Sequence, residues 1–152
     1  MIFLVIIIGI IILDQYTKKI ALQNLYEGKY YPIFDNKIHL TIHKNKGAAL
    51  NLFERFPRTI KIITIPPIIG LVLYILKLIK GKGFVLTKLA VGFIIGGGIG
   101  NLIDRIKKGH VVDFFYFNFK RCPIFNIADI FIILGAILLQ ILIFIKKFPI
   151  GK

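Results

Sequence analysis

The stretch FVLTKLAVGFIIGGGIGNLI, residues 84–103, decides the fold class of this chain. It is close to the ~20 residues that an α-helix needs to cross the hydrocarbon core of a bilayer. Gly92, Gly96 and Gly100 recur every four residues along one face, and such a stripe of small residues lets a neighbouring helix approach closely. The stretch therefore predicts a membrane helix that packs tightly against another helix.

Three more apolar stretches of similar length lie around it, at residues 2–22, 59–79 and 125–145. The second of them precedes residues 84–103 across the short turn KGKG, so these two stretches are expected to form an antiparallel hairpin. The first has neither a basic start nor a small-x-small cleavage site, and we expect a retained anchor, not a signal peptide. The sequence thus predicts a membrane protein, mainly α, with four transmembrane helices in a single domain over residues 1–152.

The composition supports a membrane protein and disfavours several other classes. The chain is 57% hydrophobic with a mean hydropathy of +0.80, far above a soluble protein of this size. Its net charge of +14 comes from basic residues that flank the apolar stretches, which favours anionic membrane lipids as partners over nucleic acid. The single Cys122 excludes an internal disulfide, and neither a metal nor a cofactor is expected.

Two regions between the apolar stretches have the residue types of β-strands. In IHLTIH, residues 38–43, apolar and polar side chains alternate, which is typical of a half-buried strand. The other region is rich in β-branched and aromatic residues. We expect a small antiparallel sheet, a β-cradle formed by about residues 29–58 and 109–120, on the membrane surface. His39 and His43 would share one face of their strand but lie ~13 Å apart, too far to share a metal.

Counting the spans predicts that many polar side chains meet at one membrane interface. The first span ends near Asp14, the third ends near Arg105 and the fourth starts near Asn126, so these ends lie on the same side. Lys18 follows Asp14 at helical spacing, and one interpretation is a local ion pair that eases the helix end into water. The other is a functional cluster, because ionisable groups at spans are costly. The residues expected there are Asp14, Lys18, Asn101, Asp104, Arg105, Asp113, Asn126 and Asp129.

Two of these carboxylates, Asp113 and Asp129, lie among Phe, Ile and Val in HVVDFFYFNFKRCPIFNIADIF, residues 110–131. Two neighbouring carboxylates in such surroundings cannot both ionise, so they share one proton. One can then take a proton from water while the other donates to the carbonyl oxygen of an amide. The chain contains no serine, and its cysteine has no placed histidine partner, so this pair is the candidate catalytic group.

Two functions without catalysis remain as alternatives. In a small transporter or channel, the acids would form a proton or cation path, and such a path needs polar residues at several depths. The middles of residues 59–79 and 125–145 are apolar apart from Gln140, which disfavours a path. In a membrane scaffold or chaperone, the acids would serve only folding.

Five blocks of the sequence, in this order, resemble the bacterial lipoprotein signal peptidases (signal peptidase II): LDQYTK at 13–18, NKGAAL at 45–50, GNLIDR at 100–105, GHVVDF at 109–114 and FNIAD at 125–129. The resemblance implies a multi-pass aspartic peptidase of the bacterial cytoplasmic (inner) membrane. It also implies cytoplasmic termini and a β-cradle with the active site at the extracytoplasmic interface. A raw count of basic residues by the positive-inside rule would place the termini outside, and the resemblance overrules it.

The resemblance further implies the substrate, an inhibitor and the roles of individual residues. The enzyme would remove the signal peptide of a diacylglyceryl-modified prolipoprotein just before the lipidated cysteine. Globomycin would occupy the same site. No metal is needed, because two carboxylates supply both acid and base, and a four-span unit could work alone as a monomer, although the sequence leaves the oligomeric state open. Asp113 and Asp129 would be the catalytic dyad, and Lys18 would be mainly structural. The positions that would hold the substrate backbone or shape the site are Asp14, Asn45, Gly47, Asn101, Arg105 and Asn126. Leu50 departs from the aromatic residue usual in the family, which would alter the packing of the cradle loop.

Overall fold

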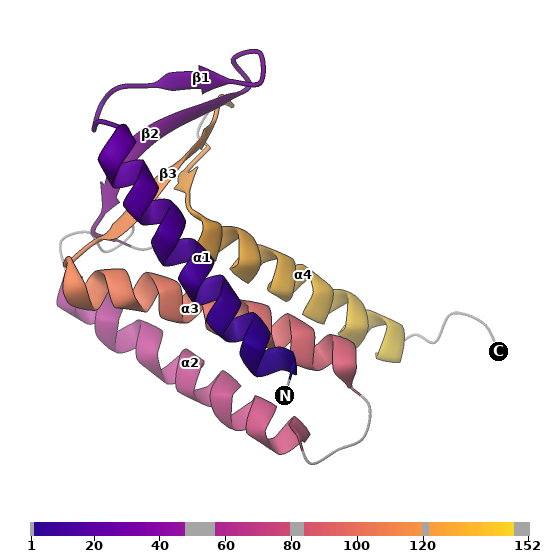
Figure 1. Ribbon diagram of the computed structural model, residues 1–152. Coiled ribbons are helices and arrows are strands. Elements are labelled where there is room, and N and C mark those ends of the chain that lie inside the picture. The colour runs from indigo at the N-terminus through magenta and orange to yellow at the C-terminus, as the bar shows by residue number, and fades with distance from the viewer. Residues whose placement is uncertain (1, 48–56, 80–83, 120–121, 148–152) are drawn as a thin grey trace.

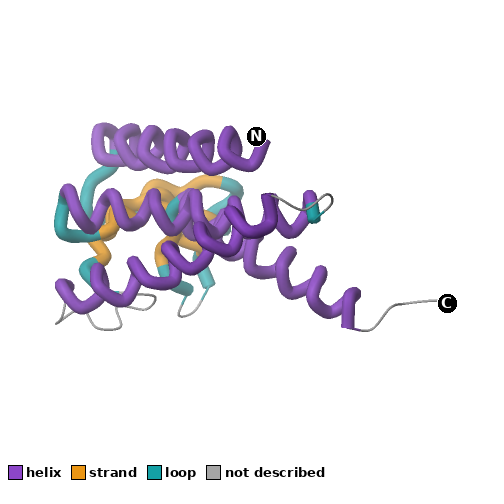
Figure 2. Tube along the Cα trace, turned by 90° about the horizontal axis from the view of Figure 1, so that it is seen from below, coloured by secondary structure: helices purple, strands orange, loops and turns teal. Residues whose placement is uncertain are grey.

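The computed structural model describes residues 2–47, 57–79, 84–119 and 122–147. Four long helices run where the apolar stretches predict them, and each begins and ends within four residues of the predicted bounds: α1 (Ile2–Asn24), α2 (Pro57–Ile79), α3 (Val85–Lys107) and α4 (Ile127–Lys147). The KGKG turn and Leu50 lie outside the described residues. Figure 1 shows the helices side by side, with the start of α1 and the end of α4 away from the sheet. Figure 2 shows the last turns of α4 diverging from the other helices.

The surface of the helices is strongly apolar. By length and composition, two stretches could cross a membrane, Val85–Lys107 and Ile127–Lys146, and α2 contains a shorter apolar stretch, Ile62–Leu78. Exposed large apolar side chains occur on all four helices, among them Val5, Ile12, Ile62, Leu73, Val85 and Ile143. Apolar surface of this extent is unfavourable in water and is normal against lipid.

Helix α3 lies between the others, and its glycines allow the close packing. A Cβ on Gly96 would lie 3.0 Å from Ile10 Cβ, and one on Gly100 would lie 2.6 Å from Asp14 Oδ2. The predicted role of the glycine stripe is confirmed, and its partner is α1. A second close contact joins α3 to α4, because a Cβ on Gly97 would collide with the carbonyl oxygen of Ala128.

A four-stranded antiparallel sheet lies at one end of the helices, with the strand order β1-β2-β3-β4 (Figure 1). Its strands are β1 (Tyr31–Ile33), β2 (Ile38–Asn45), β3 (Val111–Phe117) and β4 (Ile124–Phe125). The prediction is wrong at two boundaries. Residues 57–58, expected in the cradle, belong to α2. Residues 124–125 pair with β3, so that residue 125 is in a strand and α4 starts two residues later than the predicted span.

The predicted alternation in β2 breaks at a β-bulge. Leu40 pairs with Phe115, but the next pair is His43 with Asp113, so β2 has one extra residue there. Thr41 and Ile42, which strict alternation places on opposite faces, are consequently both buried. Bulges re-aim side chains and are common beside active sites.

Candidate active site

Asp113 and Asp129 line one pocket with a cavity volume of about 210 Å³. Asp113 comes from β3 and is 1% exposed, while Asp129 lies in the first turn of α4. The other polar residues of the lining are Asn45, Asn101 and Arg105, all of them predicted site residues. The remaining walls are apolar and consist of Val111, Pro123, Ile124, Phe125, Ile132 and Ile133. The pocket therefore presents two acids and several hydrogen-bonding groups in an otherwise apolar wall.

Asp113 reaches the pocket because the chain reverses sharply at the end of α3. Gly109 has a φ of +79°, a left-handed conformation that glycine adopts without a steric penalty, and it directs the chain back into β3. The backbone N–H of Val112 then donates to Asp104 Oδ2 at 3.2 Å, which attaches β3 to α3. Asp113 is thus placed beside the residues at the end of α3.

Asp129 is held by a reciprocal cap at the start of α4. Asn126 Oδ1 accepts from the backbone N–H of Asp129 at 2.9 Å, and Asp129 Oδ2 accepts from the backbone N–H of Asn126 at 3.2 Å. This is the arrangement of a capping box, here with Asn and Asp in the two positions. The carboxylate is consequently fixed at a helix N-terminus, where a negative charge is favourable.

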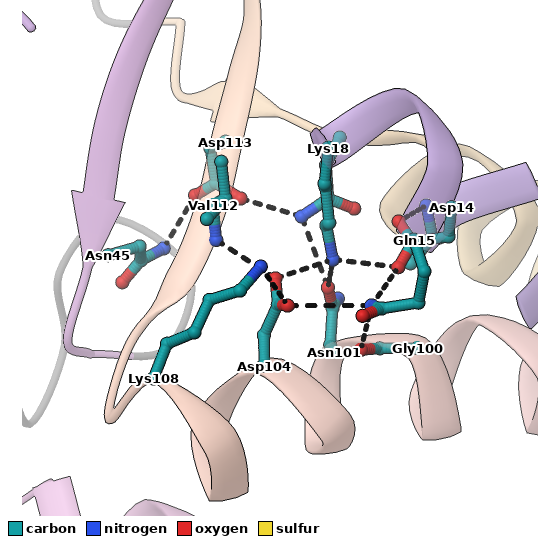
Figure 3. Close-up of polar contacts among 12 residues, drawn as sticks. Asp14, Gln15, Lys18, Asn45, Gly100, Asn101, Asp104, Lys108, Val112 and Asp113 are labelled. Atoms are coloured by element: carbon teal, nitrogen blue, oxygen red, sulfur yellow. Dashed lines mark hydrogen bonds and ion pairs between the residues drawn. The ribbon is translucent and has the colours of Figure 1, made fainter. Parts of the chain in front are cut away.

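Three asparagines donate hydrogen bonds to the two carboxylates. Asn126 Nδ2 donates to Asp113 Oδ1 at 2.6 Å and to Asn101 Oδ1 at 3.1 Å. Asn101 Nδ2 donates to Asp129 Oδ1 at 2.8 Å. Asn45 Nδ2 donates to the second oxygen of Asp113 at 3.0 Å, as Figure 3 shows. Each carboxylate therefore accepts two hydrogen bonds, and Asn126 contacts both.

The surroundings of Asp113 favour its protonated form. Burial raises the pKa of Asp113 to about 7, and the nearby charge of Asp129 acts in the same direction. The hydrogen bonds from Asn45 and Asn126 act in the opposite direction and are outweighed. Near neutral pH, one member of the pair can therefore donate a proton while the other accepts one.

This raised pKa should make stability depend on pH. The folded form binds the proton of Asp113 more tightly than the unfolded chain, whose ordinary pKa is 3.8. The stabilisation is therefore complete below about pH 4 and is lost as the pH rises through about 7. We expect the free energy of unfolding of the wild type to fall over this range relative to Asp113→Asn, whose amide does not titrate.

Thermal unfolding in detergent at a series of pH values measures this difference. The slopes are compared, because Asp113→Asn also loses one hydrogen bond at any pH: its side chain has only one acceptor oxygen for two donors. Parallel curves for the two proteins would contradict the predicted pKa.

Arg105 lines the pocket and contacts the backbone of Gly47. Its Nη2 donates to the carbonyl oxygen of Gly47 at 3.2 Å. Its buried Nε has no partner among the described residues, and a buried donor without a partner is costly. Gly47 in turn donates its N–H to Asn45 Oδ1 at 2.9 Å, so Gly47 contributes backbone groups that hold Arg105 and Asn45.

A buried ionic cluster lies behind the pocket, with Lys18 at its centre. Lys18 Nζ lies 2.8 Å from Asp14 Oδ2, 3.1 Å from Asp104 Oδ2 and 2.9 Å from Asn101 Oδ1, as Figure 3 shows. Lys18, Asp14 and Asp104 are all 0% exposed. The predicted ion pair of Asp14 and Lys18 is present, but it is buried, so the interpretation that it eases a helix end into water is wrong. Three acceptors offset the cost of burying the ammonium.

Asp14 shapes the site without lining the pocket. Its Oδ1 accepts from the backbone N–H of Ala128 at 3.0 Å, so α1 holds the first turn of α4 in place. The carboxylate fits there only because Gly100 has no side chain. Asp14 thus controls the position of the residue that follows Ala128, which is Asp129.

Two members of the cluster were not predicted. Gln15 Nε2 donates to Asp14 Oδ2 and to the carbonyl oxygen of Gly100, both at 3.1 Å. Lys108 Nζ lies 2.8 Å from Asp104 Oδ1. Asp104 and Lys108 are four residues apart at a helix end, and this spacing could have predicted their ion pair. No pattern in the sequence predicted the contacts of Gln15.

His39 lies outside this arrangement. His39 packs between the rings of Tyr30 and Tyr116, and its Nε2 lies 3.2 Å from Asn36 Oδ1. In the part of the chain that the structure describes, no group of three or more His, Cys, Asp or Glu residues could hold a metal ion. Acid–base chemistry by the two carboxylates is the chemistry that the described side chains offer.

Comparison with known proteins gives a consistent result. Residues 6–145 match the family model described as signal peptidase (SPase) II. The chain is 40% identical over 143 residues to the lipoprotein signal peptidase of Caldanaerobacter subterraneus subsp. tengcongensis, covering 94% of this chain and 96% of that protein. It is 41% identical over 141 residues to the lipoprotein signal peptidase of Halalkalibacterium halodurans, covering 90% and 87%. A solved bacterial membrane enzyme matches with a TM-score of 0.86 at 29% identity, covering 99% of this chain and 92% of the other.

Proposed function

Because the chain belongs to the signal peptidase II family, whose members are membrane proteases that process lipoproteins, we propose that it is an aspartic endopeptidase with Asp113 and Asp129 as its catalytic dyad. Its substrate is a diacylglyceryl-modified prolipoprotein, and it cleaves before the lipidated cysteine. The observation that carries the proposal is that two carboxylates from different elements line one pocket and are joined through Asn126.

The proposed reaction is a direct attack of water on the scissile amide. The ionised carboxylate takes a proton from the water as its oxygen bonds to the carbonyl carbon, and the protonated carboxylate donates its proton to the carbonyl oxygen. The tetrahedral intermediate then collapses: the C–N bond breaks, the leaving nitrogen takes a proton from the carboxyl that received it from water, and a hydroxyl of the intermediate returns its proton to the other carboxylate. The two carboxylates supply both acid and base, so the scheme requires neither metal nor cofactor.

The other polar residues bind and orient the substrate in this proposal. Arg105 and Asn45 line the pocket and can bond to an extended peptide backbone. Gly47 holds both side chains, while Asn101 and Asn126 orient the dyad. The apolar wall that includes Ile132 and Ile133 suits the apolar end of a signal peptide. Asp14 does not line the pocket; from behind it, this residue fixes the position of Asp129 through the backbone of Ala128.

The membrane arrangement is part of the same proposal. All four helices cross the cytoplasmic membrane, with the termini in the cytoplasm and the sheet as a β-cradle on the extracytoplasmic side. The pocket lies at the sheet end of the helices, beyond which the exposed helical surface is apolar. A substrate whose signal peptide and lipid both stay in the bilayer meets the dyad at that interface. A single four-helix unit contains the whole site, so a monomer suffices.

The test is cleavage of a diacylglyceryl-modified prolipoprotein by the purified protein in detergent. We expect release of the signal peptide, inhibition by globomycin and no cleavage of the same precursor without its lipid. Mass spectrometry of the product should place the new N-terminus at the modified cysteine. Equal cleavage of the unmodified precursor would contradict the proposed substrate, and release that needs an added metal would contradict the proposed mechanism.

A further inference from the structure

Lys18 fixes the orientation of the Asn101 amide. An ammonium group only donates hydrogen bonds, so the atom of Asn101 that lies 2.9 Å from Lys18 Nζ must be the amide oxygen. The NH2 group of Asn101 is thereby turned to Asp129, whose Oδ1 lies 2.8 Å away. Figure 3 shows Lys18 reaching Asn101 from α1. Lys18 therefore favours the orientation in which the NH2 group of Asn101, and not its oxygen, faces Asp129.

Asn126 is fixed by the backbone in the same way. Its Oδ1 accepts from the N–H of Asp129, which can only donate, so its NH2 group must face Asp113 Oδ1 and Asn101 Oδ1. Two donors, from Lys18 and Asn126, therefore meet at the oxygen of Asn101. Turning either amide by half a rotation would place donors against donors, so both orientations are locked.

The two carboxylates differ in what supports their donors. Asp129 lies in the first turn of α4, at the positive end of the helix dipole. Its donor Asn101 is polarised by the ammonium of Lys18, because consecutive hydrogen bonds in a buried site strengthen one another. Asp113 lies on a strand, and its donors are the neutral amides of Asn45 and Asn126. A negative charge is consequently better stabilised on Asp129.

On the basis of the aspartic mechanism above, we propose that Lys18 is a positioning residue that acts through Asn101 to keep Asp129 ionised and to leave the shared proton on Asp113. Asp129 is then the base that takes the proton from water, and Asp113 is the acid that donates to the carbonyl oxygen. Burial and the charge of Asp129 raise the pKa of Asp113 to about 7, which agrees with a proton on Asp113 at neutral pH.

The other charged groups near the dyad come from α1 and α3. Arg105 on α3 is close to both carboxylates and interacts with Asp129 more strongly than with Asp113. Asp14 on α1 is paired with Lys18 at 2.8 Å. Asp104 is neutralised locally by Lys18 and Lys108. Among these groups, Lys18 alone acts on a hydrogen-bond donor of the dyad.

The first test is the pH profile of kcat/KM for Lys18→Met, with diacylglyceryl-modified prolipoprotein as substrate. Without the ammonium, the amide of Asn101 is held by Asn126 alone and is no longer polarised by a charge, so its hydrogen bond to Asp129 should weaken and the acidic limb should move to higher pH by about one unit. The alkaline limb should move less. Lys44→Met is the matched control: Lys44 is half-exposed and does not contact Asn101, so both limbs should stay in place.

A double-mutant cycle separates positioning from a general effect of charge. If Lys18 acts through Asn101, then Lys18→Met should cause no further shift of the acidic limb in an Asn101→Ala background. An equal shift in both backgrounds would overturn the proposal, and so would an unshifted limb in Lys18→Met alone. Where turnover is too slow, the same shift is read from the ¹³Cγ resonance of Asp129, since the chain has only five aspartates to assign.

Two further variants keep the outcome interpretable. Lys18→Met leaves Asp14 without its cationic partner and Asp104 with Lys108 alone, so if it does not fold, Lys18→Met with Asp104→Asn restores the charge balance and is measured in its place. Asp113→Asn and Asp129→Asn are measured in the same assay. Activity in either would overturn the aspartic mechanism itself. Inactivity in both, with an unshifted Lys18→Met profile, would overturn only the role of Lys18.

Discussion

Replacing either Asp113 or Asp129 by Asn should lower turnover of a diacylglyceryl-modified prolipoprotein by about a thousandfold or more. In the proposed mechanism each carboxylate moves a proton in the transition state, and an amide cannot. The folded structure should survive, because Asn has nearly the same shape as Asp and keeps one acceptor oxygen for one of the two donors at each position, such as the backbone N–H of Asn126 at Asp129.

The measurement is kcat of the purified variants in detergent, with thermal unfolding as the check on folding. Asp35→Asn is the matched control, because Asp35 is exposed in the turn between β1 and β2 and its positive φ of 53° is one that Asn tolerates. Asp35→Asn should retain wild-type turnover. A folded Asp113→Asn or Asp129→Asn protein with turnover within tenfold of the wild type would refute the dyad.

Gly97→Ala should destabilise the protein by about 1–3 kcal/mol and reduce turnover with it. The added methyl group would collide with the carbonyl oxygen of Ala128, which belongs to the backbone of α4 and cannot move alone. Relief requires α3 and α4 to separate. Asn101 lies one turn further along α3, and Asp129 is the next residue along α4, so separation would lengthen the hydrogen bond between them.

The control is Gly9→Ala on α1, where an added Cβ would meet nothing within 4 Å. Ala has a higher helix propensity than Gly, so Gly9→Ala should be as stable as the wild type or slightly more stable. Thermal unfolding and kcat in the same detergent measure both variants. A Gly97→Ala protein as stable as Gly9→Ala would show that the close contact of α3 with α4 is not required.

The sequence was sufficient to predict the helices and the gathering of polar residues at one end. Long apolar stretches predict helices from local composition alone, and the four-residue repeat of Gly92, Gly96 and Gly100 predicts a close helix contact. Counting spans then places Asp14, Arg105 and their neighbours together without any knowledge of side-chain contacts. These features depend on short-range patterns, which the sequence shows directly.

Features that depend on partners distant in the chain were not predictable. The bulge at Thr41 is defined by the pairing of β2 with β3, which the sequence of β2 alone does not show. The two-residue strand at residues 124–125 is as apolar as the helix that follows it, so composition does not separate the two. The burial of Lys18 is compensated by acceptors on both α1 and α3, which a local interpretation of its spacing from Asp14 cannot include. The partners of Gln15 were hidden for the same reason.

The capping box at the start of α4 has a consequence for the entropy of the proposed reaction. Asp129 is bonded through its own N–H, and its two carboxylate oxygens accept from Asn126 and Asn101. A side chain restrained in this way has already lost its rotational freedom when the protein folds, so no ordering remains to be done when the substrate arrives. The conformational cost of aligning this carboxylate falls on folding and not on the activation barrier.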